Sequence, residues 1–439
     1  MRRAEGRALG AVHRLRMTPR DDGAPADAHA LRARRVYDPI HRFIELDAAE
    51  MALLGAPAVQ RLRRLRQLGL AYLAFPSAEH SRFSHALGAL AIGTRAFDAL
   101  RVHSPEAFDS EREFREKCTL LRASLLLHDL GHGPFSHACE SVLGVRHEQR
   151  TEAILANDDL RASIAALGVD PDAVLGLIVG ARDADPVLRE LVSGPNLDAD
   201  RMDYLLRDAY FTGVAGGTYD AEQLIESLRV VEVDGRPQLG VDGRGVVALE
   251  SFVLARYMMF ATVYFHHTTR AFERVLCDVL DMLWPDPRAL DAIDEFLAWD
   301  DFRVIDDIRT MEGEGVRALR ERRTVYGLAA EFNAEEDLQT FELCERALRE
   351  RFGEDAVWSD SQEQLLHRLP LTTSGAAPTV RVRLMGRIVD ARTASDLIAK
   401  LSGKVYWRKL FVRTDRASVD EARAICADLI ATGGQPRLL

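Results

Sequence analysis

The stretch LLLHDLGHGPFSH (residues 125–137) decides how the fold and the function of this chain are interpreted. Three leucines run directly into a histidine–aspartate pair, although His and Asp are costly to bury unless they are paired or bound to a metal. His132 and His137 follow in the same stretch. Several imidazoles beside a carboxylate have the ligand types of a divalent metal site. The alternative for each histidine alone is a core residue whose ring is satisfied by hydrogen bonds.

A helix through this stretch would place His128 and His132 on one face, because they are four residues apart. The glycines and the proline that follow are residues that end helices. We therefore expect the chain to turn after the helix, so that His137 folds back toward the same pocket.

A metal at this point needs ligands from other segments. His85 lies near the start of another predicted helix. Asp200, Tyr204 and Asp208 recur every four residues in DADRMDYLLRDAYFTG (198–213), so they share one helical face. The ordinary alternatives are a packed helix residue for His85 and a favourable first-turn carboxylate for Asp200. Together with the histidine–aspartate pair, these residues supply a complete ligand set.

The composition suits a globular enzyme large enough for two or three domains, with 47% hydrophobic and 28% charged residues in a chain of 439. Acidic residues outnumber basic ones by 68 to 57, and the net charge of −11 argues against a general polyanion-binding surface. No apolar run approaches the roughly 20 residues of a membrane helix, so no membrane partner is expected.

The five cysteines are scattered and form no CxxC pair, which favours a reducing, cytoplasmic location over a disulfide framework. The first 33 residues are rich in Arg and Ala and lack the apolar segment of a secretory signal. We interpret them as a flexible leader, with Met17 as an alternative start to Met1.

The periodicity predicts a mainly α fold with short β-hairpins and a small α+β module at the C-terminus. Residues 35–46 and 227–249 have strand and turn patterns. Helical patterns fill residues 48–70 and most of the chain up to about residue 369, where LPLTTSGAAP (369–378) is a linker candidate. The predicted division is a leader at 1–33, a core at 34–290, a helical extension at 291–370 and an α+β module at 371–439.

Two basic stretches allow a second interpretation. QRLRRLR (60–66) could be a nucleic-acid-binding stripe, but leucines at helical spacing favour a core-facing helix with solvated arginines. GKVYWRKLFVR (403–413) interleaves basic and aromatic residues, and we interpret it as a strand of the C-terminal module, with a subunit interface as one candidate location, rather than a single-strand binding platform. Nucleic acid therefore remains open as a partner but is not indicated.

The ordered set His85, His128–Asp129 and Asp200 resembles the HD superfamily of metal-dependent phosphohydrolases, above all its deoxynucleoside triphosphate triphosphohydrolase branch. The motifs that carry the resemblance are separated blocks in the order typical of that branch, and they span roughly residues 35 to 210. They are DPIHRFIEL, QRLRRLRQLGLAYLAFPSAEHSRFSHALG, HDLGHGPFSH, HEQ and DADRMDYLLRD. The resemblance implies an HD-domain helical core at 34–290.

The resemblance also implies a role for each matching residue. It implies that a divalent metal is held by His85, His128, Asp129 and Asp200. It implies that phosphate contacts or acid–base catalysis fall to His132, His137 and His147, with Glu140 orienting one of them. Such ligands suit Mn, Mg, Fe, Ni or Zn.

The remaining matches concern the nucleotide. Contacts with the triphosphate are implied for Arg82 and Arg201. Further substrate-pocket positions are implied for Arg256 and Tyr264, a wall against the sugar for Gln67 and Leu68, and the ribose 3′ side for Tyr204 and Asp208. The implied reaction is attack of water at the α-phosphorus of a dNTP, which releases the deoxynucleoside and intact tripolyphosphate. A homodimer or homotetramer is expected.

Two residues depart from the family pattern. Gly55 stands where the nucleotide-activated branch has a guanine-reading Asp, which argues against guanine-specific activation but leaves a nucleotide activator open. Phe260 stands where that branch has a pocket His, so base and sugar preference should differ.

Two alternative functions remain. One is an HD phosphatase or phosphodiesterase acting on another nucleotide, and the other is a nucleotide or nucleic-acid sensor with weak catalysis.

Overall fold

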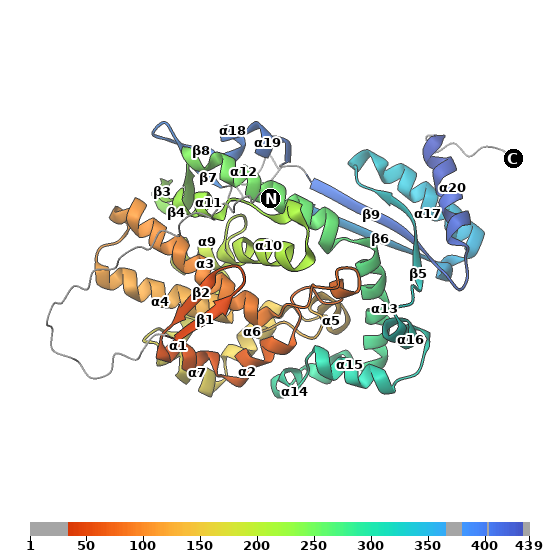
Figure 1. Cartoon of the computed structure of the whole chain (residues 1–439), viewed down its shortest axis with the longest axis horizontal. Helices are drawn as coiled ribbons and strands as arrows, with labels where there is room; N and C mark the ends of the chain where they lie inside the picture. The colour runs from red at the N-terminus through yellow and green to blue at the C-terminus, as the bar shows by residue number, and fades with distance from the viewer. Residues whose placement is uncertain (1–33, 366–379, 402–403, 433–439) are drawn as a thin grey trace, which may run out of the picture.

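The structure, a computed structural model, describes residues 34–365, 380–401 and 404–432. The predicted leader and the linker candidate lie outside these described residues. Helices dominate the fold, which confirms the mainly α prediction (Figure 1). The α-helices are α1 (Ala48–Leu54), α2 (Pro57–Arg61), α3 (Arg82–His103), α4 (Glu111–Leu127), α5 (His137–Leu143), α6 (His147–Leu155), α7 (Asp158–Ala165), α8 (Pro171–Ile178), α9 (Pro186–Ser193), α10 (Ala199–Thr212), α11 (Ala221–Glu226), α12 (Val246–Met259), α13 (His267–Leu283), α14 (Ile293–Leu297), α15 (Asp301–Thr310), α16 (Glu314–Glu321), α17 (Leu338–Phe352), α18 (Ala391–Ala394), α19 (Asp396–Leu401) and α20 (Val419–Ala431).

Small residues on α3 let α4 and α10 pack closely against it. A Cβ added at Gly93 would lie 2.3 Å from the Leu125 Cδ1 atom and 3.0 Å from the Ala199 Cβ atom. The start of α3 is fixed by Ser81, whose hydroxyl accepts a hydrogen bond from the Ser84 amide. Helix α3 is therefore the central helix of the main core, with α4 and α10 as its neighbours.

Residues 48–70 do not form the continuous helix that their leucine spacing predicts. Helix α1 ends at Leu54, α2 begins at Pro57, and a 3₁₀ turn at 62–64 follows. Proline disfavours the helical conformation in the residue before it, and Ala56 has an extended backbone with ψ of 137°. The helical pattern in this segment is therefore divided at the proline.

Arg61 is fully buried, so the prediction of solvated arginines in this segment is wrong for that residue. Its guanidinium donates hydrogen bonds to the backbone carbonyls of Trp299 and His132, both at 2.8 Å, and lies 4.7 Å from the centroid of the Phe296 ring. Burial lowers the pKa of Arg61 to about 10. The buried arginine therefore links the segment before α3 to the HD stretch.

Nine strands form three small sheets within the described residues. They are β1 (Arg34–Asp38), β2 (Arg42–Leu46), β3 (Leu228–Val233), β4 (Arg236–Asp242), β5 (Tyr326–Phe332), β6 (Val357–Leu365), β7 (Arg381–Leu384), β8 (Arg387–Asp390) and β9 (Lys404–Arg413). The hairpins β1–β2 and β3–β4 confirm the predicted strand and turn patterns. The sheet orders are β1-β2, β3-β4-β7-β8 and β5-β9-β6.

Strands β5 and β6 lie in the region predicted to be a purely helical extension, and that prediction is wrong. Strand β9 pairs antiparallel with both of them, while β7 pairs parallel with β4 of the core. The C-terminal strands therefore divide between two sheets. The sheet β5-β9-β6 lies at the right of Figure 1, and α17 and α20 pack on it through a small apolar core of its own.

One described run, Gly243–Tyr264, is long and apolar enough to cross a membrane by length and composition alone, contrary to the expectation from the sequence. Leu249, Phe252 and Val253 within it are buried in the main core. Packing within the protein therefore accounts for part of its apolar character.

Candidate metal centre

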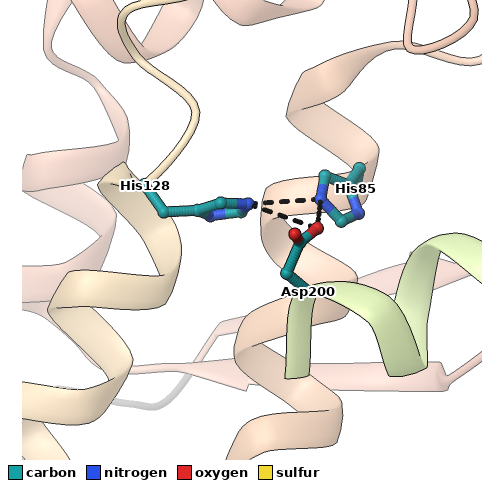
Figure 2. Close-up of side chains that lie close together, drawn as sticks. All are labelled: His85, His128 and Asp200. Atoms are coloured by element: carbon teal, nitrogen blue, oxygen red, sulfur yellow. Dashed lines mark hydrogen bonds and ion pairs between the residues drawn. The ribbon is translucent and has the colours of Figure 1, made fainter. Parts of the chain in front are cut away.

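The predicted metal ligands meet from three elements. His85 lies in the first turn of α3, His128 and Asp129 follow the last residue of α4, and Asp200 lies in the first turn of α10. Figure 2 shows the side chains of His85, His128 and Asp200 pointing toward one another. The His85 Nε2 atom lies 2.9 Å from Asp200 Oδ1 and 3.3 Å from His128 Nε2. The structure therefore brings these three predicted ligands together.

Asp129 lies next to the other three predicted ligands. Its Oδ1 atom lies 3.5 Å from His128 Nε2, and its Oδ2 atom lies 3.8 Å from His85 Nε2. Two imidazole nitrogens and two carboxylates form a donor set that suits a divalent transition metal. The residues present thus fit the divalent metal that the sequence resemblance implies.

Hydrogen bonds among the predicted ligands shift their pKa values. Burial alone would lower the pKa of His85, but its hydrogen bonds to Asp200 and Asp203 raise it to about 10. Burial would raise the pKa of Asp200, whereas the imidazoles of His128 and His85 hold it far below its usual value. A cation would replace the proton that this arrangement favours, so metal binding and proton release are coupled.

His128 is oriented by the end of its own helix. Its Nδ1 donates a hydrogen bond to the Leu125 carbonyl at 2.8 Å, which leaves Nε2 facing the other ligands. Helix α4 ends at Leu127, so the prediction that His128 and His132 share a helical face is wrong. His132 still reaches the centre, because its Nε2 lies 3.3 Å from Asp129 Oδ1.

Arg82, predicted as a triphosphate contact, lies against the predicted metal ligand Asp129 in this structure. Its Nη1 donates to Asp129 Oδ2 at 2.6 Å, and its Nη2 donates to the Ser136 hydroxyl at 2.7 Å. Burial alone would raise the pKa of Asp129, but Arg82 and the neighbouring imidazoles hold it well below its usual value. Ser136 was not identified from the sequence, and its positive φ of 53° marks a strained turn there.

His132, Glu140 and His147 form a second cluster beside the first. The Nδ1 atoms of His132 and His147 lie 3.3 and 3.0 Å from the same Glu140 Oε1 atom. The two rings stack with centroids 4.0 Å apart and planes 16° apart, so their in-plane lone pairs run nearly parallel and do not converge on one point. The geometry therefore favours a shared carboxylate over a second cation.

The two stacked histidines have opposite pKa shifts. Burial and the Arg82 guanidinium lower the pKa of His132 to about 4. Burial also acts on His147, but its hydrogen bond to Glu140 outweighs it and raises the pKa. His137 begins α5, and its side chain lies outside the described part of the structure, so its role stays a prediction.

The predicted nucleotide residues lie on the side of the centre formed by α10 and α12. The Tyr204 ring lies 6.5 Å from the His85 ring and 6.1 Å from the Tyr264 ring. The Tyr264 hydroxyl donates to Asp208 Oδ2 at 2.8 Å, and His80 Nε2 donates to Asp208 Oδ1 at 2.8 Å. The face predicted for Tyr204 and Asp208 thus continues from the metal ligands.

Two arginines on this side differ in their partners. Arg201 pairs with Asp198, the residue that caps α10, and donates to the Gly194 carbonyl at 2.5 Å. Arg256 is buried at 8% exposure and lies 5.5 Å from the centroid of the Phe260 ring. Its Nε and Nη1 atoms have no hydrogen-bond partner among the residues that the structure describes, and burial lowers its pKa. Arg256 is therefore a buried cation with donors to spare.

The predicted sugar wall lies in the segment before α3. The backbone amide of Gln67 donates to the His80 carbonyl at 2.9 Å, while its side-chain Oε1 is buried with no hydrogen-bond partner in the described segments. Leu68 is half-buried and packs against the main core. His80 was missed from the sequence, although its place in AEHSRFSH, near Arg82 and His85, was a usable signal.

Comparison with known proteins gives the family of the chain. Residues 219–429 match the model of the HD associated region. The chain is 39% identical over 245 residues to the uncharacterized protein YwfO of Bacillus subtilis, a match that covers 55% of this chain and 54% of that protein. It is 29% identical over 277 residues to the deoxynucleoside triphosphate triphosphohydrolase SAMHD1 of Homo sapiens, covering 55% of this chain and 43% of that protein. Each match thus spans about half of the relative's length.

Solved structures extend the comparison over most of the chain. A hypothetical protein from Aquifex aeolicus matches with a TM-score of 0.76 and 30% identity, covering 90% of this chain and 100% of that one. A phosphohydrolase from Bacteroides thetaiotaomicron has the same fold, with a TM-score of 0.69 at 24% identity and coverage of 87% and 100%. The chain belongs to the HD-domain family that is related to the deoxynucleoside triphosphate triphosphohydrolases.

Proposed function

We propose that this protein is a metal-dependent phosphohydrolase that converts deoxynucleoside triphosphates to deoxynucleosides and tripolyphosphate. The observation that carries the proposal is the convergence of His85, His128, Asp129 and Asp200 from three separate elements. Buried polar groups are paired or coordinate a metal, and the side chains that meet here have the ligand types of a divalent cation. The SAMHD1 relatives support the choice of dNTPs as substrates.

A divalent cation in this centre would polarise a phosphate oxygen and lower the pKa of a bound water. The residues of the chain supply the rest of the chemistry. His85 and His128 would hold the cation through unprotonated Nε2 atoms, and Asp129 and Asp200 would balance its charge. Their positions in three elements hold the centre rigid while the substrate changes.

The buried arginines support a triphosphate as the bound group. Arg256 has two unpaired donors in a desolvated position, and Arg201 lies beside Asp198 on the same side of the centre. Guanidinium groups pair with phosphate oxygens through charge-assisted hydrogen bonds. An anion that accepts from Arg256 would remove the cost of leaving its Nε and Nη1 without partners.

The stacked histidines supply a proton near the reacting phosphorus. His147 is only partly buried and lies against Glu140, which favours its protonated form. We assign His147 as the donor to the leaving 5′ oxygen and His132 as the neutral neighbour that contacts phosphate. Glu140 keeps both rings in place.

The sugar specificity is assigned to the segment before α3 and to the tyrosine side. Gln67 and Leu68 would close the space at the 2′ carbon, so that a ribose hydroxyl has no room. Asp208 and Tyr264 are already hydrogen-bonded to each other and lie where they would meet the 3′ side together with Tyr204. A base preference different from that of the SAMHD1 branch is expected, because Phe260 replaces a histidine.

The setting of the enzyme is also part of the proposal. None of the five cysteines, all within the described residues, forms a disulfide, which supports the reducing cytoplasm as its location. We propose a homodimer or homotetramer, with a nucleotide other than a guanine nucleotide as the activator if one is needed.

The test is incubation of the purified protein with each of the four dNTPs and Mn²⁺ or Mg²⁺, followed by separation of nucleoside from tripolyphosphate. Equal amounts of both products are expected. Products that carry a monophosphate would favour an HD phosphatase or phosphodiesterase, and no turnover of any nucleotide would favour a sensor. The Asp200→Asn variant removes one ligand charge and should be inactive.

A further inference from the structure

Asp203 is a buried carboxylate that neither the ligand set nor the substrate side uses. It lies on α10 one turn after Asp200 and is 0% exposed. The Nδ1 of His85 donates to its Oδ2 at 2.8 Å, and the Nε2 of His41 donates to its Oδ1 at 2.6 Å. A charge so deep in the core requires several partners, and the metal ligand His85 is one of them.

Arg207 holds the other side of this carboxylate. Its Nε and Nη2 donate to Asp203 at 2.8 and 2.9 Å, and its Nη1 donates to Asp38 at 2.8 Å. Asp38 and His41 both belong to the hairpin β1–β2, so the motif DPIH reaches the centre through Asp203. The paired carboxylate thus connects a hairpin, α10 and the metal ligand on α3.

The packing around this pair is tight. A Cβ added at Gly88 would lie 2.0 Å from Asp203 Oδ1 and 2.1 Å from Arg207 Nη2. Gly88 stands one turn after His85 on α3, so the glycine lets the ion pair approach the helix that carries the ligand. Side chains packed this closely have one arrangement available and therefore fix the orientation of the His85 ring.

We propose that Asp203 is a positioning residue for the metal centre, held in turn by Arg207 and His41. The inference rests on the proposed metal site. Because a carboxylate accepts only, Nδ1 of His85 carries a hydrogen, and Nε2 is the nitrogen that would take a cation held among Asp200, His128 and Asp129. Without Asp203, the ring could rotate or hold its proton on the wrong nitrogen. The carboxylate therefore selects both the tautomer and the direction of the ligand.

The test compares Asp203→Asn with Asp360→Asn in the full-length protein. Asp360 is a matched control, because it is also buried and also pairs with one arginine, Arg270, at 2.7 and 2.8 Å. Mn²⁺ affinity is measured by titration calorimetry, and the ligand field of bound Co²⁺ by its visible absorption. Circular dichroism reports whether each variant is folded.

We expect Asp203→Asn to bind Mn²⁺ about 10- to 100-fold more weakly than the wild type and to change the Co²⁺ spectrum, as loss of an outer partner of a ligand does. Asp360→Asn should keep both the wild-type affinity and the wild-type spectrum. Unchanged affinity and spectrum in Asp203→Asn would overturn the positioning role while leaving the metal site intact. Failure of the wild type to bind either cation would overturn the metal site and, with it, this role.

A second variant covers the case in which Asp203→Asn does not fold. His41→Ala removes one partner of Asp203 from the hairpin and leaves every ligand and Asp203 itself unchanged. Its affinity for Mn²⁺ should fall by about 3- to 10-fold, the effect of one hydrogen bond. Wild-type affinity in folded His41→Ala, with an unaltered Co²⁺ spectrum, would contradict the proposal.

Discussion

His132 and His147 lie ring upon ring, 4.0 Å apart, with one carboxylate oxygen of Glu140 serving both Nδ1 atoms. Two imidazoles in the same surroundings would compete for a proton. Here burial and Arg82 lower the pKa of His132, which stays neutral. The hydrogen bond to Glu140 raises the pKa of His147, which keeps its proton to higher pH. Each ring can therefore have a different role in the same reaction.

The Glu140→Gln variant should shift the pH dependence of turnover. Glu140 raises the pKa of His147, so removal of its charge lowers that pKa. If protonated His147 is the acid, activity falls as pH rises through its pKa, and in the variant this fall begins at lower pH. We expect kcat at alkaline pH to drop by about 100-fold or more, typical of lost acid catalysis.

The matched control for this profile is Glu148→Gln. The Glu148 carboxylate lies 3.7 Å from His147 Nδ1 but is more exposed, so its charge matters less. The alkaline limb of the pH profile of Glu148→Gln should stay near that of the wild type. An alkaline limb in Glu140→Gln that coincides with the wild-type limb would remove His147 as the acid.

The Asp200→Ala variant should lose metal and activity together while the fold survives. Asp200 contacts two imidazoles at the centre but lies in the first turn of α10, where its side chain is 33% exposed. We expect metal content, measured by elemental analysis, to fall to background while far-ultraviolet circular dichroism is unchanged. Asp306→Ala, on the exposed face of α15, should retain its metal. Full activity in Asp200→Ala would remove this residue from the site.

The Gln67→Ala variant should weaken the rejection of ribonucleotides. The buried side-chain oxygen of Gln67 has no hydrogen-bond partner in the described part of the chain, and its removal would open space beside the sugar. Discrimination by a steric wall of this size is worth about 10- to 200-fold, so the dATP-to-ATP ratio of kcat/KM should fall by a factor in that range. A ratio equal to that of the wild type would place the wall elsewhere.

The Glu190→Gln variant should stabilise the protein at neutral pH. Burial raises the pKa of Glu190 from 4.5 to about 7, although its carboxylate accepts a hydrogen bond from the Leu239 amide. The folded protein therefore binds more protons than the unfolded chain between these values, and wild-type stability falls as pH rises through this window.

Glutamine has no charge to bury, so the variant should gain about 1–3 kcal/mol over the wild type above pH 7 and nothing below pH 4.5. Chemical denaturation at both ends of this window measures the difference. A gain of equal size at both ends would show that the carboxylate charge is not its cause.

Each predicted metal ligand is marked locally in the sequence. His128 and Asp129 interrupt an apolar helix, and Asp200 begins a helix whose face continues through Tyr204 and Asp208. What the sequence could not show was where the helix stops. His132 reaches Asp129 from a turn rather than from the helical face, because α4 ends at Leu127.

Two other errors have different physical causes. The strand β5 reads YGLAAEF, in which the alanines and the glutamate favour helix, and its pairing with β9 overrides that preference. Arginine usually lies in solvent, which is where the sequence pattern places Arg61, but two backbone carbonyls and the Phe296 ring compensate for its burial. The conformation of β5 and the burial of Arg61 both depend on partners far away in the sequence, which local patterns do not contain.

The division of the C-terminal strands has a consequence for how the protein is made. Strand β7 adds to the edge of β4, and β9 is inserted between β5 and β6, so both sheets stay unfinished until residues 381–413 have left the ribosome. A nascent chain interrupted before that point would expose three open strand edges, which are templates for aggregation. Ribosome stalling or premature termination late in the message would therefore give an insoluble product rather than a partly active enzyme.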